Sequence, residues 1–455
     1  MLNANLVPPR SSRATAVEYA SLLSLELPQE PGSVTDVRLP TSLHLLTAAL
    51  VLGGCAGQGA AGTGSAGAGG AAGGAGGVGG AGGDGVLTVG SGGGGGAETC
   101  DPGLPSVDDD LDGFTEDQGD CNDCDPNANP DAIEVESKNP QDEDCDGLID
   151  EPAESCDAGL AIDSLDAVEA ARALGLCRDV GAGQSWGLVS AAYVNADGSP
   201  GTPSLNVGLL PKFGDYNLPK EGDTMVGLSS GHARDSSQPE PCGGPTCTPK
   251  GPGVVPVAFP QVVPGCDTAT NFYDDVALQL VLKAPTNAHG YAFDFAFFSW
   301  EFPVFVCTAF NDQFVGLVDP APPQALQGNI SFDSLGNPVS VNLGLLPNCY
   351  PDGYDLFAYT CLGGPTPSLC PAPPSPYCPG GPGVLSGTGF DLAMTESGAS
   401  TGWLSTTAPV SPGDIFNIRF ALWDAADSQL DSTVILDRFR WLATPATVET
   451  VPSPN

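Results

Sequence analysis

Residues 56–98 consist almost entirely of glycine and alanine, and this tract limits where the chain can fold. Because such residues have almost no side chain to bury, the tract cannot offset the entropy that ordering would cost. We expect a disordered tether, and a flexible coil of about 40 residues has a root-mean-square reach of about 35 Å. Folded domains are therefore expected only after residue 98.

The charge balance excludes one class of partner. The chain has 14 Lys and Arg residues against 55 Asp and Glu residues, a formal net charge of −41. Such a field repels phosphate backbones, so we expect no nucleic-acid binding, and it disfavours docking on anionic lipid by charge alone. A Lys-poor acidic chain is typical either of divalent-cation binding or of plain solubility.

An apolar run precedes the tether, since residues 39–55 read LPTSLHLLTAALVLGGC. The run is too short for a bilayer core, which takes about 20 residues, but it suits the hydrophobic region of a signal peptide behind Arg38. Its end resembles the lipobox of bacterial lipoproteins, in which small residues precede a cysteine that is lipidated. The resemblance implies that residues 1–55 are leader and signal peptide and that Cys55 carries the lipid anchor. An ordinary cleavage site is the alternative.

Two details of the N-terminal sequence concern where translation starts and which membrane the protein reaches. Residues 1–37 are unusually long for a leader and contain Glu18, Glu26 and Glu30, so our hypothesis is that translation starts near Val37. Ala56, not Asp, follows the cysteine. By analogy with Gram-negative sorting, this favours the outer membrane or the cell surface.

The cysteines indicate an oxidising compartment. Of the 15 cysteines, 14 remain when Cys55 is set aside, an even number compatible with seven disulfides. Spacing does not determine their connectivity. The disulfide candidates are Cys100, Cys121, Cys124, Cys145, Cys156, Cys177, Cys242, Cys247, Cys266, Cys307, Cys349, Cys361, Cys370 and Cys378.

An acidic module over residues 99–157 contains the pattern DxDxDG twice. Alternate carboxylates converge when the chain curls, and the glycine permits the sharp turn. Oxygen ligands at high charge density suit a hard cation, calcium before magnesium, in loops that are not EF-hands. The predicted ligands are Asp108, Asp110, Asp112, the carbonyl of Phe114, Glu116 and Asp120 in the first loop, and Asp142, Asp144, Asp146 and Asp150 in the second. A solvated acidic segment is the alternative.

The module resembles the MopE-type metal-binding motif of exported bacterial proteins. The matching parts are the first DxDxDG, Asp120–Pro126, Asn129-Pro130-Asp131-Ala132 and DxDCDGxxDE at 142–151. Cys124 interrupts the usual Asp run, and Glu136-Ser137-Lys138 replaces the usual Cys-Asp-Gly. The resemblance implies metal binding, although no cluster of His or Met is present that copper would prefer.

Cys121 and Cys124 form a CxxC pattern among acidic neighbours. Negative charge opposes a reactive thiolate, so we expect a structural disulfide instead of a redox site. Zinc binding together with Cys145 is the alternative.

Periodicity predicts a short helix followed by a β domain over residues 158–445, with a tail at 446–455. Apolar residues recur at helical spacing over 163–177, where Asp163 or Ser164 can cap the start and Gly175 stops the helix. Strict alternation follows between Pro- and Gly-rich turns. We therefore predict a mainly β fold, an antiparallel and jelly-roll-like β-sandwich with one face of each sheet buried. The alternating positions are Leu278, Leu280 and Leu282, then Phe293, Phe295 and Phe297, then Phe416, Ile418, Phe420 and Leu422.

The β domain resembles the choice-of-anchor L family of surface domains. The matching motifs include Gln184-Ser185-Trp186-Gly187, Pro285-Thr286-Asn287-Ala288, Ser299-Trp300-Glu301-Phe302-Pro303, Phe310-Asn311-Asp312-Gln313-Phe314 and Leu436-Asp437-Arg438-Phe439. The resemblance implies a surface location and names no activity.

Four acidic residues of the β domain stand next to aromatic residues, where a lone carboxylate is costly. They are Glu301, Asp312, Asp424 and Asp431. Because few Arg residues, such as Arg419 and Arg438, could pair with them, we hypothesise a further calcium site joining the two halves of the domain. Exposed or hydrogen-bonded turn carboxylates are the alternative.

A Pro- and Gly-rich stretch at 348–383 carries four cysteines and several tyrosines. A long stretch without periodicity is often functional, and exposed tyrosines suit contact with a protein or a glycan. Simple packing stapled by disulfides is the alternative.

The residues Gly227-Leu228-Ser229-Ser230-Gly231, followed by His232, match the pattern GxSxG. A nucleophile elbow needs a strand, a turn and a helix, whereas the continuation reads as a loop, so we predict no enzyme. The chain is predicted to be an exported, lipid-anchored cell-surface protein of a binding or structural kind, stabilised by calcium, with an unknown ligand. The alternatives are an extracellular, glycan-directed hydrolase and a metal-scavenging surface protein.

Overall fold

The computed structural model describes residues 103–453, apart from 136–137, 139, 153–154, 182–183, 248–249, 303–304, 306, 342–380 and 392–397. Several predictions fall outside the described residues. These are the leader, the anchor at Cys55, the tether 56–98, Cys100, and the cysteines Cys349, Cys361, Cys370 and Cys378. All of the described residues belong to one compact unit.

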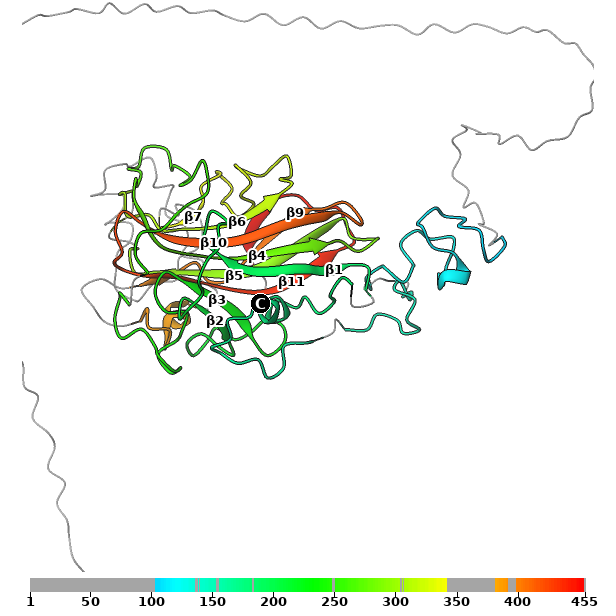
Figure 1. Cartoon of the computed structure of the whole chain (residues 1–455), viewed down its shortest axis with the longest axis horizontal. Helices are drawn as coiled ribbons and strands as arrows, with labels where there is room; N and C mark the ends of the chain where they lie inside the picture. The colour runs from blue at the N-terminus through cyan, green and yellow to red at the C-terminus, as the bar shows by residue number, and fades with distance from the viewer. Residues whose placement is uncertain are drawn as a thin grey trace, which may run out of the picture. The chain divides into compact units, whose positions relative to one another are not determined.

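The described residues form two antiparallel sheets (Figure 1), so the prediction of a mainly β sandwich is confirmed. The first sheet has the order β1-β4-β10-β6-β7. The second has the order β12-β9-β5-β11-β3-β2, and β8 pairs with β5 beside this path. The strands are β1 (Gly187–Val194), β2 (Val207–Leu210), β3 (Met225–Ser229), β4 (Phe272–Lys283), β5 (Gly290–Ser299), β6 (Gln313–Asp319), β7 (Val339–Ser340), β8 (Ala399–Ser400), β9 (Leu404–Pro409), β10 (Ile415–Ala425), β11 (Ser432–Leu442) and β12 (Glu449–Pro452).

The core lies between the two sheets. The alternating side chains predicted on β4, β5 and β10 all belong to one buried cluster, as the period of two requires when the same face of each strand points inward. Phe293 of β5 meets Phe420 of β10 edge to face, with ring centroids 4.8 Å apart. Tyr291 of β5 stacks on Phe416 of β10 at 5.0 Å. Aromatic pairs therefore join the sheets across the core.

The outer faces of the central strands are also buried, which corrects the predicted one-sided burial. Every residue of β5 and of β3 is buried. Outside the second sheet, Phe213 and Phe390 pack on Phe298 with ring centroids 5.0 Å and 5.7 Å away. Outside the first sheet, Phe259 lies 6.0 Å from Trp423. Connections that carry aromatic residues cover both sheets, and strand alternation cannot reveal such covers.

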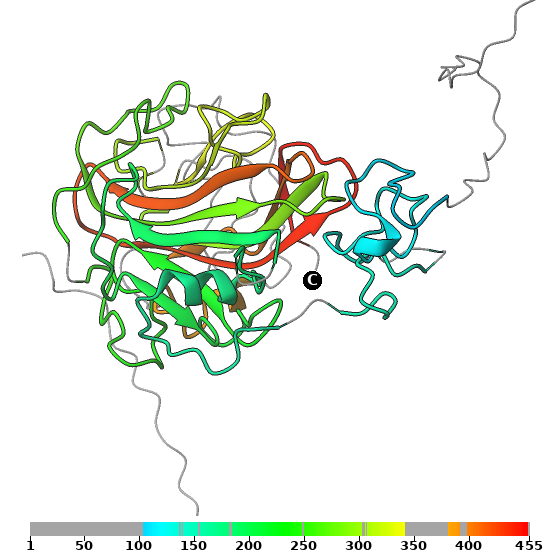
Figure 2. The ribbon, with the colours of Figure 1, turned by 45° about the vertical axis from the view of Figure 1, so that its right-hand side comes forward.

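One α-helix, α1 (Ala167–Ala173), occurs in the described part of the chain and packs beside β1 and β3 (Figure 2). It is shorter than the predicted 163–177. Asp166 caps its start by accepting a hydrogen bond from the N–H of Val168 at 2.9 Å, so neither Asp163 nor Ser164 is the cap. Within the described residues, no helix combines the length and apolar character needed to span a membrane.

The β domain also extends past its predicted end at residue 445. Strand β12 pairs with β9 in register Glu449 to Thr407 and lies at the edge of the second sheet. Residues 449–452 of the predicted tail are therefore part of the sandwich.

Replacing Phe293 with Ala is expected to lower the free energy of unfolding by about 3–5 kcal/mol, because it removes a fully buried ring and leaves a cavity between the sheets. Chemical denaturation of the full chain measures the change. Val257→Ala, at a side chain that is 97% exposed, is the control and should change stability by less than about 0.5 kcal/mol. Equal effects of the two substitutions would contradict this placement of the core.

Candidate metal centres of the acidic module

The two DxDxDG segments fold into closely similar loops. The carboxylate of Asp108 accepts hydrogen bonds from the N–H groups of Leu111 at 2.7 Å and Gly113 at 3.1 Å. The carboxylate of Asp142 receives the N–H of Gly147 at 3.0 Å in the same way. Gly113 and Gly147 have φ angles of +102° and +92°, which glycine adopts without strain. The first Asp and the Gly of each repeat therefore close the turn.

The later carboxylates curl back on the loop backbone. Asp110 accepts the N–H of Asp112 at 3.1 Å, and Asp112 accepts that of Phe114 at 2.8 Å. In the second loop, Asp146 accepts the N–H of Leu148 at 2.8 Å. These bonds use one oxygen of each side chain and fix its direction, as alternate ligands around a cation require.

A first centre forms where the first loop meets the following turn. Asp110, Asp120 and Asp123 each bring a carboxylate oxygen within 4.8 Å of the others. The 3₁₀ helix η1 (Glu116–Gln118) and a left-handed Gly119 carry the chain back towards this point. Oxygens of Asp110, Glu116 and Asp120 are buried without a hydrogen-bond partner among the described residues. Such orphaned acceptors fit a bound cation.

The first centre concentrates negative charge. The pKa of Asp110 is raised to about 6, chiefly by burial and with a contribution from the carboxylates of Asp112, Asp120 and Asp123. Burial also raises the pKa of Asp112 and of Asp120. Each shift shows that the ionised form lacks sufficient compensation from the protein. A hard cation among these oxygens would supply that compensation.

A second centre is organised by Glu134. Its carboxylate accepts the N–H groups of Glu143 at 2.9 Å, Asp144 at 3.1 Å and Asp150 at 2.7 Å. Carboxylate oxygens of Glu134, Asp144 and Glu151 lie within 4.8 Å of one another and could share one cation. The same holds for oxygens of Glu134, Glu143 and Asp150. Oxygens of Asp150 and Glu151 are buried without a hydrogen-bond partner in the described structure. The second centre therefore also offers free acceptors.

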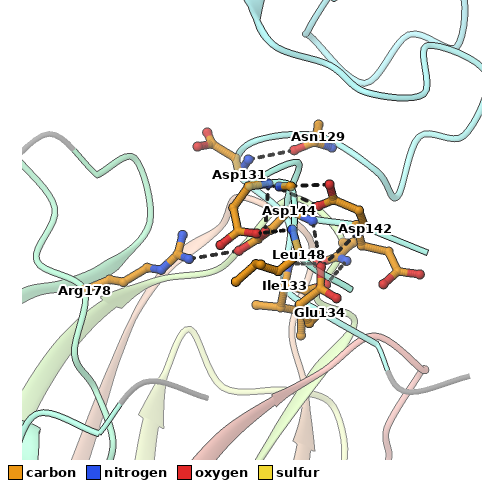
Figure 3. A network of polar contacts seen from close by, with 12 residues as sticks. Asn129, Asp131, Ile133, Glu134, Asp142, Asp144, Leu148 and Arg178 are labelled. Carbon is orange, nitrogen blue, oxygen red and sulfur yellow. Dashed lines mark hydrogen bonds and ion pairs between the residues drawn. The ribbon is translucent and has the colours of Figure 1, made fainter. Parts of the chain in front are cut away.

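Arg178 reaches the second centre from the β domain and lies 3.1 Å from Asp144 (Figure 3). Even so, burial raises the pKa of Asp144, and the charge of Asp146 adds to the shift. Burial also raises the pKa of Glu143 and Glu151. One arginine does not balance this group of carboxylates, so the second centre fits a cation too.

The structure places the predicted ligands unevenly. In the first loop, the predicted ligands Asp108, Asp110 and Asp112 lie together. In the second loop, the predicted ligand Asp144 lies with Glu134 and Glu151, whereas the predicted ligand Asp146 is exposed. Four carboxylates that join the centres were not among the predicted ligands, namely Asp123, Glu134, Glu143 and Glu151. They stand outside the alternate positions of the DxDxDG repeats. Only the density of acidic residues around the repeats could have indicated them.

Disulfides join the module internally and to the β domain. Cys121 pairs with Cys145, next to Asp120 and Asp144, with the Cα atoms 5.5 Å apart. The expected structural disulfide is therefore confirmed, and it links the two loops instead of closing the CxxC. Cys156 pairs with Cys177 beyond helix α1. Disulfide bonding is also confirmed for Cys124, for Cys242 with Cys247, and for Cys266 with Cys307.

The module docks on the turn between β4 and β5. Asn287 accepts the N–H of Ile133 at 2.9 Å and donates to its carbonyl at 2.9 Å. The hydroxyl of Thr286 donates to Asn129 at 2.7 Å, and the Asn129 amide donates to Asp112 at 2.8 Å. A continuous chain of hydrogen bonds therefore runs from the first centre to the β domain.

The four acidic residues predicted in the β domain are close enough to interact electrostatically, but they have different hydrogen-bond partners. Glu301, Asp312 and Asp424 come together inside the sandwich. Asp431 instead accepts the N–H of Cys247 at 2.7 Å, beside the Cys242–Cys247 disulfide. Because both sulfurs are oxidised there, that group offers no thiolate ligand.

The GxSxG match lies at the end of β3 and in the residues after it. Ser229 is buried, donates its hydroxyl to the carbonyl of Ser432 at 3.1 Å and lies 2.8 Å from the hydroxyl of Thr433. Nδ1 of His232 lies 2.9 Å from the carbonyl of Glu240. The serine hydroxyl therefore forms part of the pairing between β3 and β11.

Comparisons of the chain with models of protein families, with curated proteins and with solved structures found no match. The resemblances to the MopE-type motif and to the choice-of-anchor L family therefore stay predictions.

Asp120→Asn is expected to lower the calcium affinity of the first centre by at least about tenfold, because it removes a charged, buried ligand oxygen. Calorimetric titration of the full chain measures this. Asp117→Asn makes the same charge change at an exposed neighbour and should leave the affinity unchanged. If both substitutions weakened binding equally, net charge and not coordination would explain calcium binding.

Proposed function

We propose that the chain is an exported, lipid-anchored surface protein of a binding or structural kind, in which calcium folds the acidic module and holds it against the β domain. The observation that carries this proposal is the set of buried carboxylate oxygens without hydrogen-bond partners at the first and second centres. The hydrogen bonds from Asp112 through Asn129 to Thr286 connect the first centre to the β domain.

The chemistry of the donors supports calcium. Both centres offer carboxylate oxygens, and residues 103–157 contain no His or Met. Cys121, Cys124 and Cys145 are disulfide-bonded, so they supply no soft thiolate ligand. Hard oxygen ligands in flexible loops favour calcium, whereas copper and zinc prefer nitrogen and sulfur.

The disulfides and the N-terminal sequence support export. Bonds such as Cys156–Cys177 and Cys266–Cys307 persist in oxidising compartments and are rare in the cytosol. The apolar run ending at Cys55 and the Gly/Ala tract after it favour a lipid anchor with a flexible tether. A surface protein held this way would reach an extracellular protein or glycan without direct contact between its folded part and the lipid.

A role without catalysis fits the placement of Ser229. Its hydroxyl is bonded inside the sheet and is not presented at a strand-to-helix turn. We therefore propose binding or structural support and not hydrolysis.

Cys55→Ser is expected to abolish incorporation of a labelled fatty acid and to move the chain from the membrane fraction to the soluble envelope fraction. Metabolic labelling and fractionation of the producing bacterium measure both effects. Gly54→Ala keeps a small residue before the cysteine and should retain the label. Membrane association and labelling that persist in Cys55→Ser would contradict the proposed anchor.

A further inference from the structure

Three acidic residues meet inside the sandwich although they come from different elements. Glu301 follows β5 of the second sheet, Asp312 directly precedes β6 of the first sheet, and Asp424 lies in β10. Their exposed fractions are 1%, 0% and 1%. Carboxylates buried to this degree need compensation for the water that they have lost.

Asp312 is held in place by both sheets. One oxygen accepts the N–H of Ala425 in β10 at 2.9 Å, and the other accepts the hydroxyl of Ser432 in β11 at 2.6 Å. Its own N–H donates to Glu301 at 3.4 Å. These bonds fix the direction of the carboxylate, and each oxygen retains a second lone pair.

Asp424 is the group that the protein leaves unsatisfied. Both of its carboxylate oxygens are buried, and neither has a hydrogen-bond partner of ordinary geometry among the described residues. The side chains of Asp312 and Ser230 lie against it. The Ser230 hydroxyl, however, donates to the carbonyl of Ser432 at 3.3 Å. An unsatisfied carboxylate aimed at a second carboxylate calls for a ligand between them.

The described basic residues do not neutralise this cluster. Every Lys and Arg after residue 102 is described, and residues 342–380 and 392–397 contain no Lys, Arg or His. In the described residues, Glu301, Asp312 and Asp424 take part in no ion pair. The ion pairs are Arg172 with Asp179, Arg178 with Asp144, Lys212 with Asp235, Lys250 with Asp275, and Arg438 and Arg440 with Asp294.

We propose that a divalent cation of the calcium class binds between Glu301, Asp312 and Asp424 and joins the two sheets at this end of the sandwich. The donors are oxygens only, which excludes a preference for soft metals. Asp431, the fourth acidic residue of the hypothesis from the sequence, lies near enough for its charge to raise the pKa of Asp424. One of its oxygens receives the N–H of Cys247, so we do not count it among the three ligands.

The interior site is separate from the acidic module. The module docks at Asn287, just before β5, whereas Glu301 follows the other end of that strand. A strand of this length spans roughly 30 Å, so the two kinds of centre cannot share a cation. Their occupancies can therefore be measured independently.

The test counts the calcium ions retained by the full chain. A variant with Asp110→Asn, Asp120→Asn, Glu134→Gln and Asp150→Asn disables the acidic module. After gel filtration in calcium, elemental analysis should find about one equivalent per folded chain in this variant. Adding Asp424→Asn should reduce that value to none. Adding Asp414→Asn, at an exposed residue just before β10, should leave it unchanged.

Single substitutions test the site without the four changes in the module, which could themselves cause misfolding. In the otherwise unaltered chain, Asp424→Asn and Glu301→Gln should each remove one calcium equivalent, with near-ultraviolet circular dichroism verifying the fold. If the module-disabled variant folds but retains no calcium, protons and not a cation neutralise the cluster. If the last equivalent survives both substitutions, calcium is bound elsewhere. Either result overturns the proposal. Loss of calcium from the module alone would contradict the proposed function and leave this inference standing.

Discussion

Desolvation of carboxylates is the constraint on which the rest of the structure depends. Hydrophobic burial between two sheets explains the β-sandwich, but it does not explain why Asp110, Asp120 and Asp150 carry buried oxygens without partners. An ionised group in this condition is costly unless another charge compensates it. Because the protein has few basic residues, a cation is the compensation that best fits the oxygen-only donors. Closure of the acidic loops and docking of the module would then follow from metal binding.

The sandwich gives these carboxylates fixed positions. The turn between β4 and β5 presents Thr286 and Asn287 to the acidic module, and the rigid core pair Phe293–Phe420 lies farther along β5. The Cys121–Cys145 disulfide keeps the two loops close before any metal binds, which reduces the entropy that binding must overcome. The cross-links and the sheets thus prepare sites that the carboxylates alone would keep apart by repulsion.

The sequence predicted the features that have a local period. Alternation on β4, β5 and β10 identified the core-facing side chains, and the DxDxDG repeats located the two loops. Features that depend on distant segments were missed. The covers formed by Phe213, Phe259 and Phe390, the carboxylates of Glu134 and Asp123, and the pairing of Cys121 with Cys145 have no periodic signal. The gathering of Glu301, Asp312 and Asp424 was anticipated only from the cost of placing acids beside aromatic residues. Asp431, which was grouped with them, lies nearby and accepts the N–H of Cys247.

The most direct measurement of the central claim is the thermal unfolding of the oxidised full chain in calcium, in excess chelator, and after calcium is restored. A ligand at 100 times its dissociation constant stabilises the folded state by about 2.7 kcal/mol per site. The account therefore predicts a rise of several degrees in the melting temperature, lost in chelator and recovered with calcium. An unchanged melting temperature, or stabilisation by copper with no effect of calcium, would contradict it.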